Sequence, residues 1–94
     1  METGLPVVAL SGEVDLCCAP QVRASFARID GPVVVDMSSV TYADSSLLNE
    51  LAQLRRRVGH VELVVTSPQL RRILDIVGFT QRFRVVATRE DAGR

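Results

Sequence analysis

Residues 32–58 read PVVVDMSSVTYADSSLLNELAQLRRRV, and this stretch decides the fold. Its first part, residues 32–37, is an apolar run rich in β-branched valine, which predicts a buried strand. From residue 44 onward the pattern changes, and apolar side chains recur at the helical positions 47, 51, 54 and 58. The stretch therefore predicts a strand, a connecting loop over residues 38–43, and a helix over residues 44–58.

The two ends of this helix carry the signals that helix ends require. Asp44 or Ser45 can accept hydrogen bonds from the first free backbone N–H groups, which makes either a good N-cap. Three arginines, Arg55–Arg57, occupy the last turn, where positive charge complements the helix dipole, and Gly59 follows them. These signals fix the limits of the helix.

The flanking sequence extends this pattern in both directions. Apolar runs predict a strand buried on both faces at residues 6–11, a third strand at 61–66 and a short last strand at 84–88. Helices are expected to begin at Pro20, with a stripe formed by Val22, Phe26 and Ile29, and at Ser67-Pro68, with a stripe formed by Leu70, Ile73, Leu74 and Val77. Gly78 ends the last helix, and residues 89–94 are expected to fray.

The order β-α-β-α-β-α-β predicts a small α/β fold with a mostly parallel sheet. Ninety-four residues suffice for one domain, in which helices pack largely on one face of the sheet. We expect a single domain over residues 1–94 with a core from about residue 6 to residue 88.

The charges balance, with eleven arginines and eleven acidic residues, which does not favour a nucleic-acid-binding protein. Residues 1–50 are mainly acidic and residues 51–94 mainly basic, so opposite charges are expected on different parts of the surface. No apolar run approaches the roughly 20 residues of a membrane span, and no signal peptide is recognisable. We expect a cytoplasmic protein without membrane insertion.

Side chains that could form an enzyme centre are scarce. The single histidine, His60, follows a glycine that ends a helix, and the adjacent Cys17 and Cys18 have no partner base or metal-ligand spacing nearby. Glycine-rich phosphate-binding patterns are absent from the sequence. These features predict a binding protein rather than an enzyme, with no metal site and no cofactor.

The triplet Asp44-Ser45-Ser46 is the most informative polar stretch, because it follows a strand and opens a helix. Asp44 by itself satisfies the requirement for an N-cap, so the two serines that follow exceed what a cap requires. A phosphate on such a serine would add about −1.5 to −2 charges, which a helix N-terminus tolerates. Repulsion of a docking protein would then switch binding without unfolding the helix.

Three segments give the chain a resemblance to the STAS domain family, named for sulfate transporters and anti-sigma factor antagonists. These segments are LSGEVD at residues 10–15 with Ala19-Pro20, VVVDMSSVTYADSS at 33–46, and SPQLRRILDIVGF at 67–79. The resemblance covers residues 7–86 and implies a protein that binds an anti-sigma factor, often a serine kinase. That kinase phosphorylates the serine matched by Ser46, which abolishes binding, and a phosphatase restores it.

The resemblance also implies a partner-binding surface, made of Glu13, Asp15, Asp44, Ser45, Ser46 and Leu47. Leu47 departs from the family, which usually has glycine after the serine pair, and it either hinders phosphorylation or extends the apolar stripe. An extra N-terminal edge strand, found in many antagonists, is not expected here, so one sheet edge is left open as a dimerisation site. We expect a monomer or a weak homodimer. The alternatives are a constitutive adaptor subunit of a lipid-trafficking ABC transporter or signalling assembly, and a small-ligand or nucleotide-binding domain.

Overall fold

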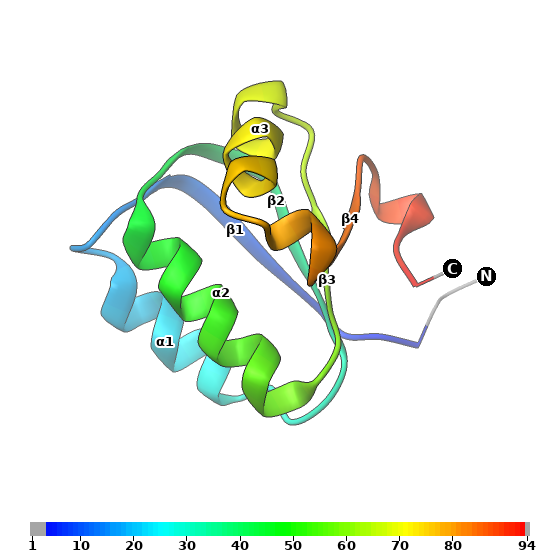
Figure 1. Cartoon of the computed structure of the whole chain (residues 1–94). Coiled ribbons are helices and arrows are strands. Elements are labelled where there is room, and N and C mark those ends of the chain that lie inside the picture. Colours follow the sequence, from blue (N-terminus) through cyan, green and yellow to red (C-terminus); the bar gives the residue numbers. More distant parts are fainter. Residues whose placement is uncertain (1–3, 94) are drawn as a thin grey trace.

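The computed structural model describes residues 4–93, which form four strands and three α-helices in the predicted alternating order (Figure 1). The elements are β1 (Val7–Val14), α1 (Ala19–Ala27), β2 (Val33–Ala43), α2 (Ser45–Val58), β3 (Val61–Val64), α3 (Pro68–Ile76) and β4 (Arg84–Val86). Two short 3-10 turns, η1 (Phe79–Gln81) and η2 (Arg89–Asp91), flank β4.

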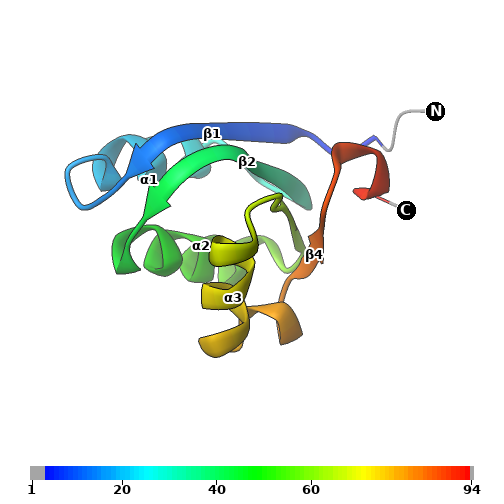
Figure 2. The same ribbon diagram turned by 90° about the horizontal axis from the view of Figure 1, so that it is seen from above.

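The sheet has the order β1-β2-β3-β4, and every neighbouring pair is parallel. One hydrophobic cluster joins alternate residues of the strands, among them Val33, Val35 and Leu63, to side chains from all three helices. Figure 2 shows α2 and α3 together on one side of the twisted sheet. The predicted fold class, a parallel α/β sheet with its helices packed on one face, is confirmed.

The helix ends follow the local sequence signals. Asp44 is the N-cap of α2, and Ser67 is the N-cap of α3, where its hydroxyl oxygen accepts a hydrogen bond from the Leu70 N–H at 3.2 Å. Gly59 and Gly78 follow α2 and α3 with φ values of 85° and 81°. Residues other than glycine rarely adopt such positive φ values. The limits of both helices were therefore readable from capping chemistry.

Strands β1 and β2 differ from the sequence-based expectations. Residues of β1 alternate between exposed and half-buried, because β1 is an edge strand with one open face, so the prediction of burial on both faces is wrong. Residues 38–43, expected as a loop, continue β2 as strand and pair with the second half of β1. Two register shifts in this pairing accommodate the polar, irregular sequence there.

The C-terminal segment is ordered rather than frayed, because it covers the face of the sheet opposite the helices. Ala92, which is 3% exposed, packs in a second small cluster with Val34, Val64 and Val86. Beside it, the Arg89 side chain forms an ion pair with the buried carboxylate of Asp36 on β2. The expected fraying of residues 89–94 is wrong for residues 89–93, which the structure describes.

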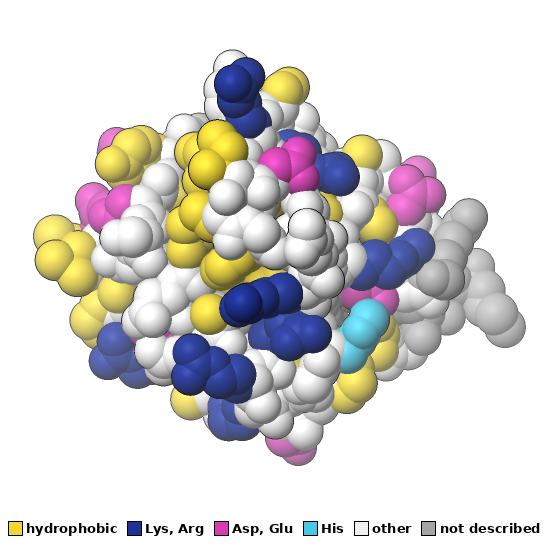
Figure 3. Space-filling view, in the orientation of Figure 1, with side chains coloured by type: hydrophobic (Ala, Val, Ile, Leu, Met, Phe, Trp, Pro, Cys, Tyr) yellow, Lys and Arg dark blue, Asp and Glu magenta, His cyan; other side chains and the backbone are white. Residues whose placement is uncertain are grey.

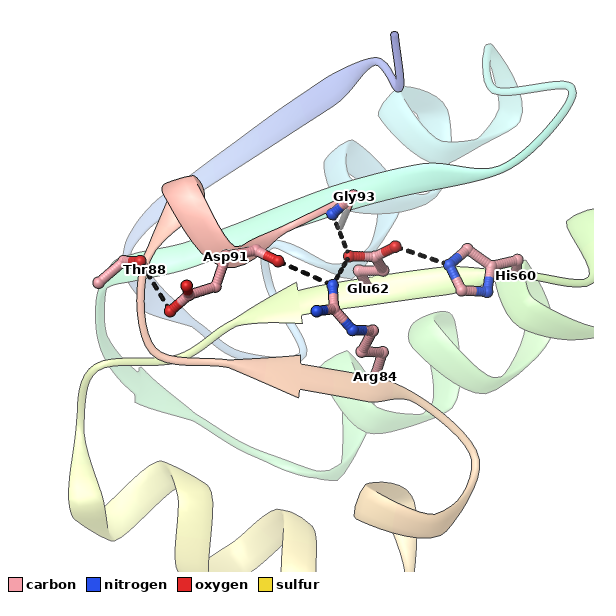
Figure 4. A network of polar contacts seen from close by, with 6 residues as sticks. All are labelled: His60, Glu62, Arg84, Thr88, Asp91 and Gly93. Carbon is pink, nitrogen blue, oxygen red and sulfur yellow. Dashed lines mark hydrogen bonds and ion pairs between the residues drawn. The ribbon is translucent and has the colours of Figure 1, made fainter. Parts of the chain in front are cut away.

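The buried carboxylate of Glu62 on β3 fixes the end of this segment (Figure 4). It accepts hydrogen bonds from His60 Nε2 at 2.8 Å, from Arg84 Nη1 at 2.7 Å and from the Gly93 N–H at 2.6 Å. Burial opposes ionisation of Glu62, but the bonds from His60 and Gly93 and the Arg84 charge outweigh it and hold its pKa below the ordinary value. The exposed side chain of His60 therefore supports a structural carboxylate.

The apolar stripe predicted for α3 is only half buried. Leu70 and Leu74 lie in the core, whereas Ile73 is 42% exposed and Val77 is 46% exposed. Ile76, which the stripe did not include, is 74% exposed. The helix therefore presents an apolar flank to the outside of the molecule.

Candidate functional site

The predicted site residues come together where β1 and β2 end, at the carboxyl edge of the sheet. The Asp44 N–H donates to the Val14 carbonyl oxygen at 3.3 Å, so the chain leaves β2 directly beside the end of β1. Helix α2 begins one residue later, and the loop between β1 and α1 lies next to its first turn. In parallel sheets this edge is where ligands and partners bind.

The carboxylate of Asp44 organises this edge through two backbone hydrogen bonds. Its Oδ1 accepts from the Ser46 N–H at 2.8 Å, which is the N-cap bond of α2. Its Oδ2 accepts from the Leu16 N–H at 3.2 Å, which holds the loop after β1. One side chain thereby fixes both the helix start and the neighbouring loop.

The two serines occupy the first turn of α2, as the sequence predicted. Ser45 is exposed and Ser46 is half-buried at the rim of the site. Because the Ser46 N–H is already bound by Asp44, the position of its backbone is fixed. An anion placed here would meet the positive end of the helix dipole.

The two other predicted acids lie at the end of β1 and in the loop that follows it. Glu13 is exposed near the end of β1, and the half-buried Asp15 accepts a hydrogen bond from the Cys17 N–H at its Oδ1, at 3.0 Å. The exposed Cys17 and the half-buried Cys18 are free thiols. The acids Glu13, Asp15 and Asp44 thus belong to one edge of the molecule.

Leu47 does not lie on this surface. Its side chain is 1% exposed and packs in the main core with Leu51 and Leu54. The apolar stripe, and not added bulk at the surface, therefore explains leucine at this position. Leu47 holds the first turn of α2 against the sheet from inside.

Two exposed apolar side chains near the site were missed by sequence reasoning. Leu16 is 72% exposed in the loop held by Asp44, and Tyr42 is 54% exposed near the end of β2. Neither is part of an apolar pattern, so no periodicity signal could have found them. Tyrosine is among the residue types enriched in protein–protein interfaces.

Residues 4–93 contain no group of three or more His, Cys, Asp or Glu side chains arranged to hold a metal ion. No helix in the same range is long and apolar enough to cross a membrane. The side chains described at this edge are acids, hydroxyls and exposed apolar groups.

The sequence profile of the STAS domain matches residues 2–92 of the chain. A STAS-domain containing protein of Pseudomonas aeruginosa (strain UCBPP-PA14), PA14_20770, is 32% identical over 85 residues, which cover 83% of this chain and 84% of the relative.

Proposed function

The chain belongs to the STAS domain family, and we propose that it is a cytoplasmic anti-sigma factor antagonist whose binding is switched off by phosphorylation of Ser46. In this proposal the partner is an anti-sigma factor with serine kinase activity, and a phosphatase restores the unmodified state. The protein acts by binding and not as an enzyme.

The position of Ser46 in the first turn of α2 carries the proposal. Its side chain is half-buried at the rim, and Asp44 fixes its backbone by a 2.8 Å hydrogen bond. A phosphate of about −1.5 to −2 charges would add to the negative charge of Asp44 and of the acids at the end of β1. The helix dipole tolerates the phosphate, so the modification changes the surface and leaves the fold intact.

The docking surface that we propose consists of Glu13, Asp15, Asp44, Ser45 and Ser46, with Leu16 as its apolar contact. Leu16 is 72% exposed in a loop that Asp44 anchors, which suits a contact that is buried on binding. Leu47 supports this surface from the core, so a kinase would not meet its side chain. A like-charged dianion introduced into such a surface typically costs several kcal/mol of binding.

The first experiment tests the modification. The purified protein is incubated with ATP and a purified anti-sigma factor of the serine kinase type, and the phosphosite is mapped by mass spectrometry. We expect phosphate on Ser46, no incorporation in Ser46→Ala, and normal incorporation in Ser45→Ala as the neighbouring control. Phosphate on another residue, or none, would contradict the switch.

The second experiment tests binding to the same purified partner by calorimetry. Ser46→Asp should weaken binding by at least tenfold, whereas Ser25→Asp adds the same charge at an exposed position of α1 and should not. If Ser46→Asp binds like the wild type, a constitutive adaptor replaces the switched antagonist as the proposed function.

A further inference from the structure

Strand β2 has a free edge along its second half. On one side it pairs with β1 as far as Ala43, but on the other side its pairing with β3 ends at Asp36. Beyond that point no strand within residues 4–93 pairs with β2 on the β3 side. In the part of the chain that the structure describes, side-chain bonds reach the backbone of residues 38–43 only at Ser38. Its carbonyl oxygen accepts from Thr66 Oγ1 at 3.4 Å, and its N–H donates to Asp36 Oδ1 at 2.9 Å.

Helix α3 faces this edge across an open groove. One wall is the end of β2 and the other is the first half of α3; the lining residues are Val40, Thr41, Tyr42, Ala43, Ser67, Gln69, Leu70 and Ile73. Figure 3 shows hydrophobic side chains gathered in a strip between α3 and α2, on the face that holds the groove. A strand edge and an apolar helix flank therefore lie opposite each other.

The helix wall has the chemistry of a side-chain-binding surface. Ile73 is 42% exposed, and Gln69, Ile73 and Ile76 follow one another at helical spacing on the same flank. All eight lining residues are uncharged. Leu70, which is 7% exposed, forms part of the groove wall, so an apolar group entering here would extend the main core.

The size of the groove distinguishes between classes of occupant. Its hollow volume is about 180 Å³, below the roughly 300–1,000 Å³ of sites that enclose small molecules. A volume of this size suits one or two side chains. The open strand edge, in turn, offers backbone hydrogen-bonding groups that only another extended backbone can pair along its length.

We propose that the groove binds an extended, uncharged segment of the partner protein as an added strand beside β2, with an apolar side chain packed on Leu70 and Ile73. This inference rests on the proposed function in one respect, because the docking protein supplies the bound segment. Ala43 lines the groove and directly precedes Asp44, so the groove continues the surface around Ser46. The partner would contact Ser46 with one region and fill the groove with another.

A phage-displayed library of random decapeptides, selected on the wild-type protein, tests the groove without knowledge of the partner. We expect enriched peptides rich in β-branched and aromatic residues, and slower hydrogen exchange of residues 40–43 when a synthetic peptide is bound. Ile73→Glu should weaken the peptide at least tenfold. Val7→Glu, at an equally exposed valine (43%) on β1, should change its affinity less than threefold.

Backbone methylation of the peptide tests strand addition itself. N-methyl groups at alternate residues should abolish binding, and those at the intervening residues should not, because successive amides of a strand point to opposite sides. Absence of enriched peptides, equal binding by Ile73→Glu, or no alternation would overturn the proposal. So would a dimer of the protein alone that Ile73→Glu dissociates, since a second copy would then occupy the groove.

The peptide assay also separates this inference from the phosphorylation switch. An uncharged peptide in the groove does not meet the charge at position 46, so Ser46→Asp should bind it within threefold of the wild type. If Ser46→Asp retains the full-length partner, the switch fails while peptide binding stands. If peptides fail but Ser46→Asp loses the partner, the groove fails while the switch stands.

Discussion

The carboxylate of Asp44 holds the backbone of Leu16 in place, with Oδ2 accepting from the Leu16 N–H at 3.2 Å. The same carboxylate caps α2 through Ser46. The loop after β1 and the start of α2, which are distant in sequence, are therefore positioned by one side chain. Changes at Asp44 are expected to affect both the stability of the helix and the docking surface.

Replacement of Asp44 by alanine should lower the free energy of unfolding by about 1–2 kcal/mol, because the N-cap bond is lost. Asp44→Asn retains a carbonyl oxygen for the Ser46 N–H but loses the second acceptor for Leu16, so it should cost less. Urea unfolding of both variants measures this difference. Equal stability of Asp44→Ala and the wild type would show that the cap does not matter.

The effect of Ser46→Asp on partner binding should depend on salt. Interactions between exposed charges are largely screened beyond the Debye length, which is about 10 Å at 0.1 M salt and about 3 Å at 1 M. We expect the loss of affinity to shrink as the salt concentration rises from 0.05 to 0.5 M. A loss that is constant over this range would indicate a steric effect instead of charge repulsion.

Leu47→Gly, which restores the residue usual in the family, should strongly destabilise the protein. Truncation of a buried leucine to alanine lowers the free energy of unfolding by about 2–5 kcal/mol. Glycine in place of alanine inside a helix lowers it by about 1 kcal/mol more. Thermal and urea unfolding measure the loss. Leu16→Gly, at an exposed loop position, is the control and should leave stability within about 0.5 kcal/mol.

Acid should destabilise the protein through Glu62 and Asp36, whose pKa values both lie below the ordinary 4.5 and 3.8. For Asp36, burial opposes ionisation, but the hydrogen bonds from Ser38 and the Arg89 charge outweigh it. A carboxylate with a lowered pKa stabilises the fold at pH values above its ordinary pKa. That stability is lost as the pH falls from about 4.5 through the folded-state pKa values.

Unfolding free energies measured between pH 7 and pH 3 test this dependence. Glu62→Ala should cost about 1–3 kcal/mol at pH 7, because it leaves the Gly93 N–H and Arg84 without their acceptor. It should also flatten the decline between pH 5 and pH 3. Glu90→Ala, at an exposed position of η2, is the control; if its pH profile changes as much, Glu62 is not the group responsible.

The candidate site was predictable to the extent that it depends on local chemistry. Asp44 as the cap and Ser46 in the first turn followed from short polar residues before a helical stripe, and both are confirmed in position. Leu16 and Tyr42 could not be found this way, because a single exposed apolar residue carries no periodic signal. Their surroundings arise only when β1 and β2 end side by side.

The sequence by itself determined the order of the elements and the limits of α2 and α3, because these depend on spacing and capping within a few residues. Tertiary structure alone decided that residues 38–43 form a strand, since β1 supplies their pairing partner. It also decided that the C-terminal segment is ordered, since the buried Asp36 and Glu62 on distant strands bind it. It left Ile73 exposed beside a free strand edge, because β3 ends before β2 does.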